Sequence, residues 1–150
     1  MGEFQRLGPT RGVRRNETNL SRMDAAQVFT ISLFPSAVRL DPRVEQKRFS
    51  VADRRYGLCL VGSPDGRRGS LLLHLDAELY SAILDPGQHV VHELRPGRSA
   101  WLQLLEGEGT VGDIVLTAGD GVGVTGERAL SLTAREPSEI LLFDLGGPRR

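Results

Sequence analysis

The amino-acid sequence predicts a small all-β protein, built as a jelly-roll-like antiparallel barrel with an N-terminal arm and one extra strand. Three observations lead to this fold class. From residue 49 onward, short apolar runs alternate with Gly- and Pro-containing turn signals about every 8–12 residues. No segment sustains the 3.6-residue apolar period of an amphipathic helix. The chain of 150 residues also suits one domain with additional strands.

The apolar runs are each long enough for one strand and end at residues that favour turns. The motif SPDG at 63–66 is typical, because proline presets φ and glycine permits a positive φ. Residues 76–84 also admit one helical turn, although they hold too few apolar residues at helical spacing to require it. The predicted strands contain residues 58–61, 71–75, 79–84, 89–94, 101–105, 114–116, 122–124, 130–133 and 140–143.

The first 48 residues have a different character from the rest of the chain. Residues 2–24 are polar and carry five arginines, which predicts a loose arm with at most a short strand near Gly12 and Val13. Residues 27–34 alternate in polarity, so a strand there would place Phe29, Ile31 and Leu33 on one face. We therefore expect an arm with a remnant strand at 1–48, with residues 39–48 as a charged connector, then a barrel at 49–145 and a tail at 146–150.

Composition excludes several classes of function. Lys plus Arg and Asp plus Glu both number 19, and this balance argues against a nucleic-acid partner. No apolar stretch approaches the ~20 residues of a membrane-spanning helix, and no secretory signal is visible at the start. The single Cys59 allows no disulfide within the chain, which suits a reducing compartment. These observations predict a cytoplasmic protein.

Several short motifs resemble the C-terminal cupin of pirin-like bicupins, a family with two stacked cupin barrels that includes bacterial quercetin 2,3-dioxygenases. Residues 45–49 (EQKRF) resemble the linker between those barrels, and residues 27–35 resemble the last strand of the first barrel. The similarity runs from about residue 5 to residue 145. Motifs similar to the second barrel are SPDG at 63–66, HLDA at 74–77, GR at 97–98, AWLQ at 100–103 and LLFDL at 141–145.

The resemblance implies a divalent transition metal such as Fe, Ni, Cu or Mn, held in the first barrel by three His and one Glu. Two of those His would lie on a strand that precedes the start of this chain. The third His and the Glu form a His-x-Glu motif, and here Arg15 takes the place of the His while Glu17 remains. A guanidinium offers no lone pair to a cation, so Arg15 cannot replace that ligand. We therefore expect a truncated N-terminal half without a metal site.

The general cupin motif gives a similar expectation for the second barrel. Aligned on Gly87, it places its two His at Glu93 and Arg95 and its Glu at Ala100. Aligned on Gly119, its second part places the remaining His at Leu130. The glycines fit and the ligands do not, so no metal or other cofactor is expected here.

The three histidines of the chain are the remaining metal candidates. His89 and His92 lie three apart, so on a strand they face opposite sides and cannot chelate together. His74 and one of the other two could meet across strands, and together with Glu17 they form a weak candidate set. Ordinary strand or loop positions are the more economical interpretation of all three.

Two other features have structural interpretations. Residues 121–126 spell G-x-G-x-x-G, but the alternating run at 129–133 predicts a strand where a dinucleotide site needs a helix, so turn glycines are favoured. Cys59 lies in an apolar run and is interpreted as a core thiol. Trp101 and Phe143 are expected to pack in the barrel.

Two hypotheses about function remain open. The first is a non-catalytic binding or assembly module, with Phe29, Ile31 and Leu33 covered by a second copy of the chain or by a partner cupin chain. The second is a metal-dependent quercetin 2,3-dioxygenase, using either an unexpected metal site such as Glu17, His74 and His89 or a barrel supplied by another polypeptide. No catalytic residue is predicted, and the identity of any small-molecule ligand stays open.

Overall fold

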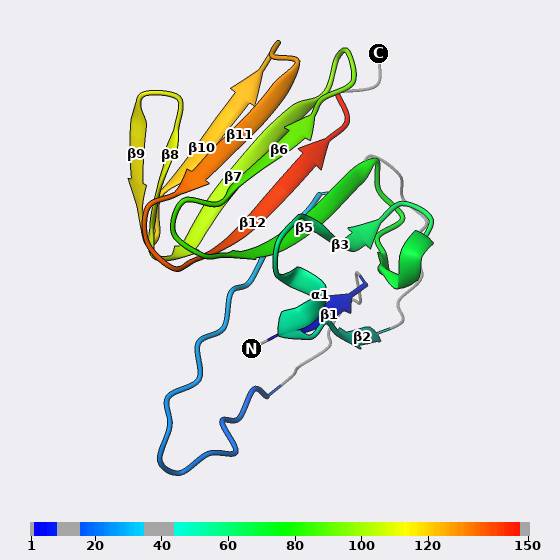
Figure 1. The fold of residues 1–150 in the computed structure, drawn as a ribbon. Helices are drawn as coiled ribbons and strands as arrows, with labels where there is room; N and C mark the ends of the chain where they lie inside the picture. Colours follow the sequence, from blue (N-terminus) through cyan, green and yellow to red (C-terminus); the bar gives the residue numbers. More distant parts are fainter. Residues whose placement is uncertain (1, 9–15, 35–43, 148–150) are drawn as a thin grey trace.

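Strands make up almost all of the regular structure in the computed structural model, which describes residues 2–8, 16–34 and 44–147. Figure 1 shows most of these strands in two layers, which confirms the predicted all-β, cupin-type jelly roll. The elements are β1 (Glu3–Leu7), β2 (Val44–Arg48), α1 (Val51–Arg54), β3 (Cys59–Ser63), η1 (Arg67–Gly69), β4 (Leu71–Leu72), β5 (Ala77–Leu84), β6 (His89–Glu93), β7 (Ser99–Glu106), β8 (Glu108–Val111), β9 (Ile114–Thr117), β10 (Gly121–Thr125), β11 (Ala129–Ala134) and β12 (Ser138–Leu145).

The two layers are sheets of six and four strands. The larger sheet has the order β10-β7-β12-β5-β3-β4, and the smaller has the order β6-β11-β8-β9. Strand β12 lies at the centre of the larger sheet and pairs antiparallel with β5 and with β7. All pairs are antiparallel except that of β3 with the two-residue β4.

The six-stranded sheet is apolar on both faces, and this property organises the molecule. Along β12, Ile140 and Leu142 belong to the cluster between the two sheets, whereas Leu141 and Phe143 belong to a second cluster on the outer face. Side chains alternate between faces along a strand, so a nearly continuous apolar run indicates burial on both sides.

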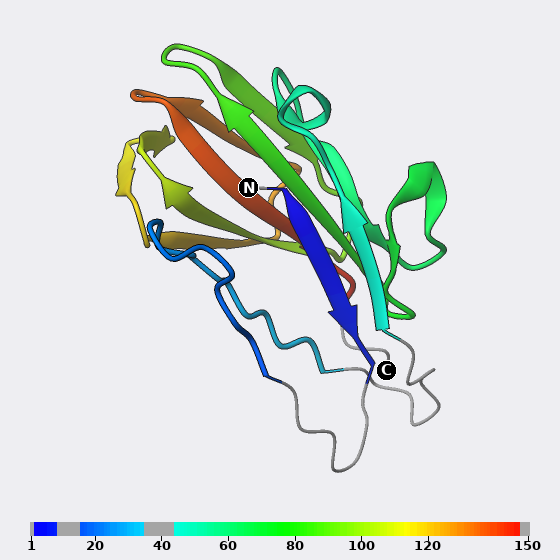
Figure 2. The ribbon, with the colours of Figure 1, turned by 90° about the horizontal axis from the view of Figure 1, so that it is seen from below.

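Strands β1 and β2 cover part of this outer face. They pair antiparallel from Glu3 opposite Arg48 to Leu7 opposite Val44. Phe4 of β1 meets Phe49 edge to face, with ring centroids 5.6 Å apart, and both rings pack on the outer cluster. Figure 2, seen from below, shows β1 and β2 side by side in front of the larger sheet.

The structure corrects two expectations for the N-terminal 48 residues. A loose arm at residues 2–24 and a charged connector at residues 39–48 were predicted, but each contains one strand of the β1–β2 pair. Polar residues alternate with half-buried ones in both strands, and the partner lies far away in sequence, so neither is recognisable alone. The predicted strand near Gly12 and Val13 lies outside the described residues.

The prediction of a strand at residues 27–34 is wrong, but the prediction that its apolar side chains share one face is confirmed. The segment is extended without assigned strand pairing, so it is a strap over the outer face and not a ladder strand. Phe29, Ile31 and Leu33 nevertheless share one side, and all three line a groove on the larger sheet. Residues 16–26 are exposed and extend away from the two sheets (Figure 1).

Smaller differences concern short elements. Residues 76–84 form strand β5 from Ala77 and not a helical turn. Strand β7 is followed after one residue by β8, which the sequence did not predict; Gly107 between them has a positive φ of 86°, and the chain passes there from the larger sheet to the smaller one. Within the described residues one α-helical turn occurs, α1, and Ser50 caps its N-terminus, with the Ser50 hydroxyl accepting from the Asp53 amide in a capping box. Among the described residues, no helix is both long and apolar enough to cross a membrane.

Candidate functional site: a filled lumen and an open outer groove

The space between the sheets, where a cupin would hold its ligands, is filled by aliphatic side chains. Leu102, Leu104 and Leu132 are completely buried there, as is Ile140. Leu84, Val90, Leu116 and Leu130 complete the packing from both sheets. Because these side chains form one continuous cluster that joins the two sheets, the layer between the sheets is a packed core.

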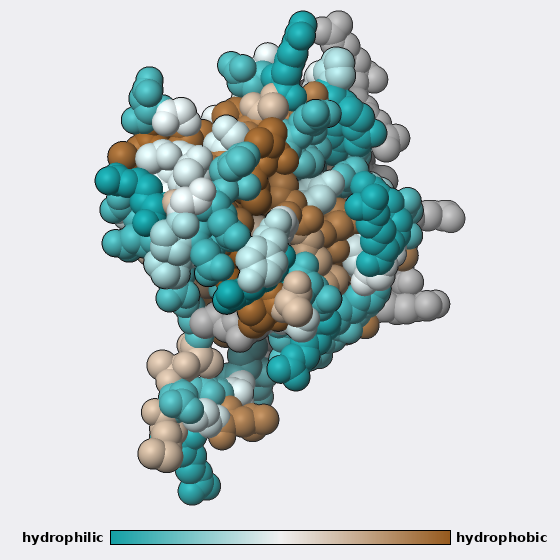
Figure 3. Space-filling model, viewed as in Figure 1, coloured by the Kyte–Doolittle hydropathy of each residue, from teal (hydrophilic) through white to brown (hydrophobic). Residues whose placement is uncertain are grey.

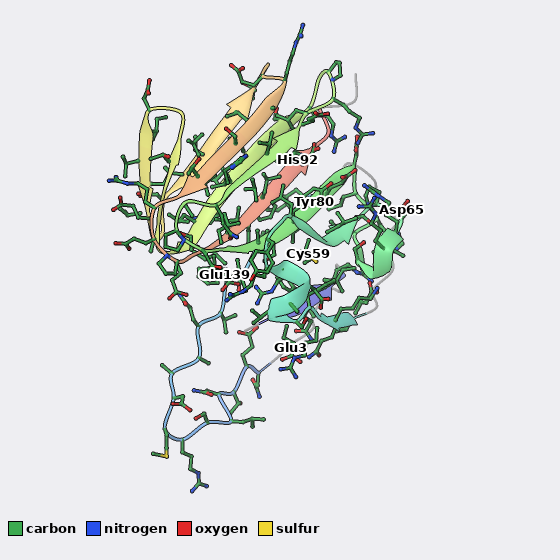
Figure 4. All side chains as sticks on the ribbon, viewed as in Figure 1. Glu3, Cys59, Asp65, Tyr80, His92 and Glu139 are labelled. Carbon is green, nitrogen blue, oxygen red and sulfur yellow. The ribbon has the colours of Figure 1, made fainter. Side chains whose placement is uncertain are left out.

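One end of the lumen is closed by polar groups instead. His92 of β6 places Nε2 2.8 Å from Oδ2 of Asp144, on the central strand β12. The imidazole also contacts the ring of Tyr80, with centroids 4.9 Å apart. Figure 4 labels His92 and Tyr80 close together at this end of the molecule.

Arg98 holds the same carboxylate from the other side. Its Nε donates to Asp144, and its Nη1 lies 2.7 Å from an oxygen of Asp76. The Arg98 side chain is 8% exposed and that of Asp144 is 4% exposed. A buried charge needs a charged or hydrogen-bonded partner, and here each ion has one, so the group is a structural ion-pair network.

A second carboxylate, Glu78, extends the network along β5. Its oxygens accept from the Tyr80 hydroxyl and from Arg67, whose Nη2 lies 2.9 Å away. Burial alone would raise the pKa of Glu78, but the hydrogen bonds from Tyr80 and Arg67 outweigh it and lower that pKa. Burial and the neighbouring Glu78 raise the pKa of the Tyr80 hydroxyl, so this hydroxyl stays protonated and donates.

The structure does not bring the four metal candidates together. His74 is exposed and has a positive φ of 55°, and Glu17 lies on the exposed segment at residues 16–26. His89 is exposed beside a surface hollow of about 190 Å³. Only His92 reaches the lumen, where it is already bonded to Asp144. Arg15, predicted to replace a ligand, lies outside the described residues.

The cupin motif positions explain why the lumen offers so few donors. Ala100 and Leu130 are buried inside, as the motif requires of its ligand positions, but neither can bind a metal. Glu93 is exposed, because Val90, His92 and Leu94 occupy the inner side of this chain segment. The motif alignment on Gly87 is therefore wrong by one residue along β6.

The donors of this barrel do not fit the metal centre that a cupin family implies. One imidazole with an ion-paired carboxylate falls short of the three or more ligands that first-row metals take. Throughout residues 2–8, 16–34 and 44–147, no group of three His, Cys, Asp or Glu lies close enough to hold an ion. No chemical step can be assigned to a metal in this lumen.

Sequence reasoning missed the His92–Asp144–Arg98 group. Alternation along β6 could have predicted that the His92 side chain points inward. Val90, His92 and Leu94 fall on one side of the strand, and the apolar Val90 and Leu94 mark that side as the buried one. Nothing in the sequence showed that Asp144, which lies 52 positions from His92, would meet it.

The outer face of the larger sheet contrasts with this closed lumen. The strap at residues 27–34 lies over it and leaves a groove of about 340 Å³. The strap passes behind the two sheets in the view of Figure 1, so Figure 3, drawn from the same side, shows another face, where a band of apolar side chains lies between polar ones. The groove is lined by Phe29, Thr30, Ile31, Leu33, Trp101, Gln103, Leu105, Leu141, Phe143 and Leu145.

The glycines at 121–126 have a different use from the turns that the sequence predicted. Gly121 and Gly123 lie in strand β10, where they face Gln103 and Trp101 of β7. Gly126 alone has the positive φ of a turn glycine, at 75°.

Cys59, predicted as a core thiol, is partly buried in the outer cluster, and burial raises its pKa above the usual value.

Comparison with known proteins agrees with this architecture. A family model described as the quercetinase C-terminal cupin domain matches residues 60–145. Quercetin 2,3-dioxygenase of Escherichia coli K12 is 38% identical over 144 residues, which cover 96% of this chain and 61% of that protein. A putative quercetin 2,3-dioxygenase of Pasteurella multocida is 34% identical over 146 residues, which again cover 96% of this chain and 61% of that protein.

Solved structures give the same picture. YhhW from Escherichia coli superposes with a TM-score of 0.71 at 37% identity, covering 77% of this chain and 48% of that one. The same bacterial pirin has been solved in complex with nickel(II), with a TM-score of 0.70. The chain thus spans about three fifths of the length of the curated relatives it matches.

Proposed function

This chain belongs to the quercetinase C-terminal cupin family of pirin-like proteins, and we propose that it acts as a non-catalytic binding and assembly module within it. The observation that carries this proposal is the inversion of the usual cupin arrangement. Here the lumen is packed with leucines and closed by ion pairs, whereas the outer groove is open to ligands or partners. We place the module in the cytoplasm, since its one cysteine can form no disulfide within the chain.

Metal content tests the non-catalytic part of the proposal. The protein is purified without chelator, and its Fe, Ni, Cu and Mn are measured by mass spectrometry. We expect far less than one ion per chain, and no oxygen-dependent loss of quercetin after these metals are added back. One ion per chain that is lost in His92→Ala and kept in His89→Ala would overturn the proposal, because it would place a working metal in the lumen.

Assembly is the second part of the proposal. The strap leaves Phe34 93% and Val28 62% exposed, and Phe29 and Ile31 stay about two fifths exposed although they line the groove. Exposed apolar patches of this kind mark interaction surfaces. We propose that a second copy of the chain covers the outward side of the strap.

Light scattering during size-exclusion chromatography tests the assembly. We expect a mass above that of one chain, reduced to one chain by the double variant Val28→Ser and Phe34→Ser. The control is Val91→Ser, which removes an exposed valine from β6, away from the strap, and should leave the mass unchanged. A strict monomer at high concentration contradicts this part of the proposal.

A second candidate function is a quercetin 2,3-dioxygenase whose metal barrel is supplied by another polypeptide. The similarity to the Escherichia coli enzyme, over 96% of this chain, favours it. Mixing this chain with a separately expressed metal-binding cupin domain of a relative separates the two candidates. Quercetin turnover that appears only in the mixture favours the split enzyme, whereas turnover unchanged by this chain favours the binding module.

A further inference from the structure

The groove on the outer face has the size and lining of a small-molecule site. Its volume of about 340 Å³ lies within the ~300–1,000 Å³ that such sites occupy. Among the described residues that line it, two are polar and uncharged, Thr30 and Gln103, and the others are apolar. A lining without charge disfavours ions, because an ion would lose its hydration there without gaining a partner.

Trp101 is held as a flat wall of this groove. Its cross-strand neighbour is Gly123, and Gly121 is the diagonal one. A Cβ at Gly121 would lie 2.4 Å from Cζ2 of the indole, and a Cβ at Gly123 would lie 3.2 Å from Cε3. The indole therefore lies over both glycines, and a side chain at either position would displace it. Trp101 is 43% exposed, so part of the ring stays available to a ligand.

Gln103 fixes the polar edge beside this ring. Its amide nitrogen donates to the carbonyls of Gly119 and Asp120, both at 2.9 Å, so its Oε1 is turned toward the indole. Oε1 accepts from Nε1 of Trp101 at 3.3 Å. An amide oxygen has two lone pairs, which leaves one acceptor site on Gln103 for a donor from a ligand.

We propose that this groove binds an uncharged, planar aromatic molecule that carries a hydroxyl or N–H donor on its edge. The aromatic face stacks on Trp101, the donor reaches Oε1 of Gln103, and the rest of the molecule packs on Leu105, Leu141 and Phe143. Offset stacking and apolar burial supply the affinity, and the free acceptor site on Gln103 sets the orientation. The inference rests on the proposed binding function and names its ligand class.

The protein contains one tryptophan, so fluorescence of Trp101 reports on the groove directly. The probes are 2-naphthol, which is planar, and decahydro-2-naphthol, which has the same skeleton and hydroxyl without aromatic rings. We expect saturable quenching and binding heat with 2-naphthol, and at least about tenfold weaker binding of the saturated analogue, the factor expected when a stacked face is lost.

Two variants and one control locate the site. Trp101→Ala should weaken 2-naphthol binding by about tenfold or more, measured by calorimetry. Tyr56→Asn is the control, since Tyr56 is an exposed aromatic residue outside the groove, and asparagine tolerates its positive φ of 71°. Gln103→Leu should weaken 2-naphthol by about fivefold and leave 2-methylnaphthalene unchanged, because only the former donates to Oε1. This variant keeps the test valid if Trp101→Ala fails to fold.

Four results would overturn the inference. The first three are no saturable binding of 2-naphthol, equal binding of the saturated analogue, and a 2-naphthol affinity that stays the same in both groove variants. The fourth is loss of 2-naphthol binding as the chain associates, which assigns the groove to a second copy. None of these results bears on metal content, so failure of the ligand inference stays distinguishable from failure of the non-catalytic proposal.

Discussion

Leu104 and Leu105 are neighbours on β7, yet their surroundings differ completely. Leu104 is fully buried between the two sheets, whereas Leu105 lines the outer groove and is partly exposed. The inner face of this sheet is thus buried against the smaller sheet, whereas its outer face is only partly covered. The difference indicates that stability resides mainly on the inner side and binding on the outer side.

The strongest test of this difference replaces the two leucines one at a time. Leu104→Ala should lower the free energy of unfolding by roughly 3–4 kcal/mol, because it leaves a cavity in a packed core. Leu105→Ala should cost about 1 kcal/mol, since its side chain already borders open space. Urea unfolding followed by circular dichroism measures both. Equal losses would show that the outer face is as tightly packed as the inner one.

The ion pairs that close the lumen give the next largest effect. Arg98→Met should destabilise the fold by about 2–3 kcal/mol, because Asp144 stays buried with His92 as its remaining partner. Arg95→Met is the control, since Arg95 is 68% exposed and reaches only Glu78 at 3.4 Å. Thermal unfolding compares the two variants, and a loss from Arg95→Met as large as that from Arg98→Met would argue against burial as the cause.

Acid should weaken the closed end of the lumen through Glu78. The pKa of Glu78 in the folded protein lies below its usual 4.5, so its contribution to stability is complete above pH 4.5 and is lost as the pH falls through the folded value. Glu78→Gln should be less stable at neutral pH and should lose less stability on acidification. Urea titrations at several pH values between neutral and strongly acid measure this, with Glu93→Gln as an exposed control on β6. If Glu78→Gln lost as much stability on acidification as the unaltered protein, Glu78 would be excluded as the cause of the acid sensitivity.

The smallest expected effect concerns the glycines beneath Trp101. Gly121→Ala should displace the indole and shift its fluorescence, while the unfolding free energy changes by about 1 kcal/mol, because the ring lies at the surface and can move. Gly112→Ala is not a suitable control, since Gly112 has a positive φ. Gly57→Ala is suitable, because a Cβ at Gly57 meets nothing within 4 Å. Fluorescence identical to that of the unaltered protein would show that the indole does not rest on Gly121.

Sequence patterns predicted the strands of the barrel where apolar runs end at turn residues, as at residues 79–84, because those signals are local. They failed where structure depends on distant partners. The β1–β2 pair joins Glu3 to Arg48, and the strap at residues 27–34 has strand-like alternation without a partner strand. The absence of lumen ligands at Ala100 and Leu130 followed from residue type, whereas the role of His92 needed the position of Asp144.

Strand β9 offers a separate route to self-association that experiments on the strap must account for. It is an edge strand of the four-stranded sheet, and its Ile114 and Val115 are about half exposed. Unpaired backbone groups beside exposed β-branched residues invite edge-to-edge pairing between molecules. A concentrated sample could therefore form larger particles without using the strap at all. Val115→Lys would introduce a charge there, so mass measurements in that background would report on the strap without association through β9.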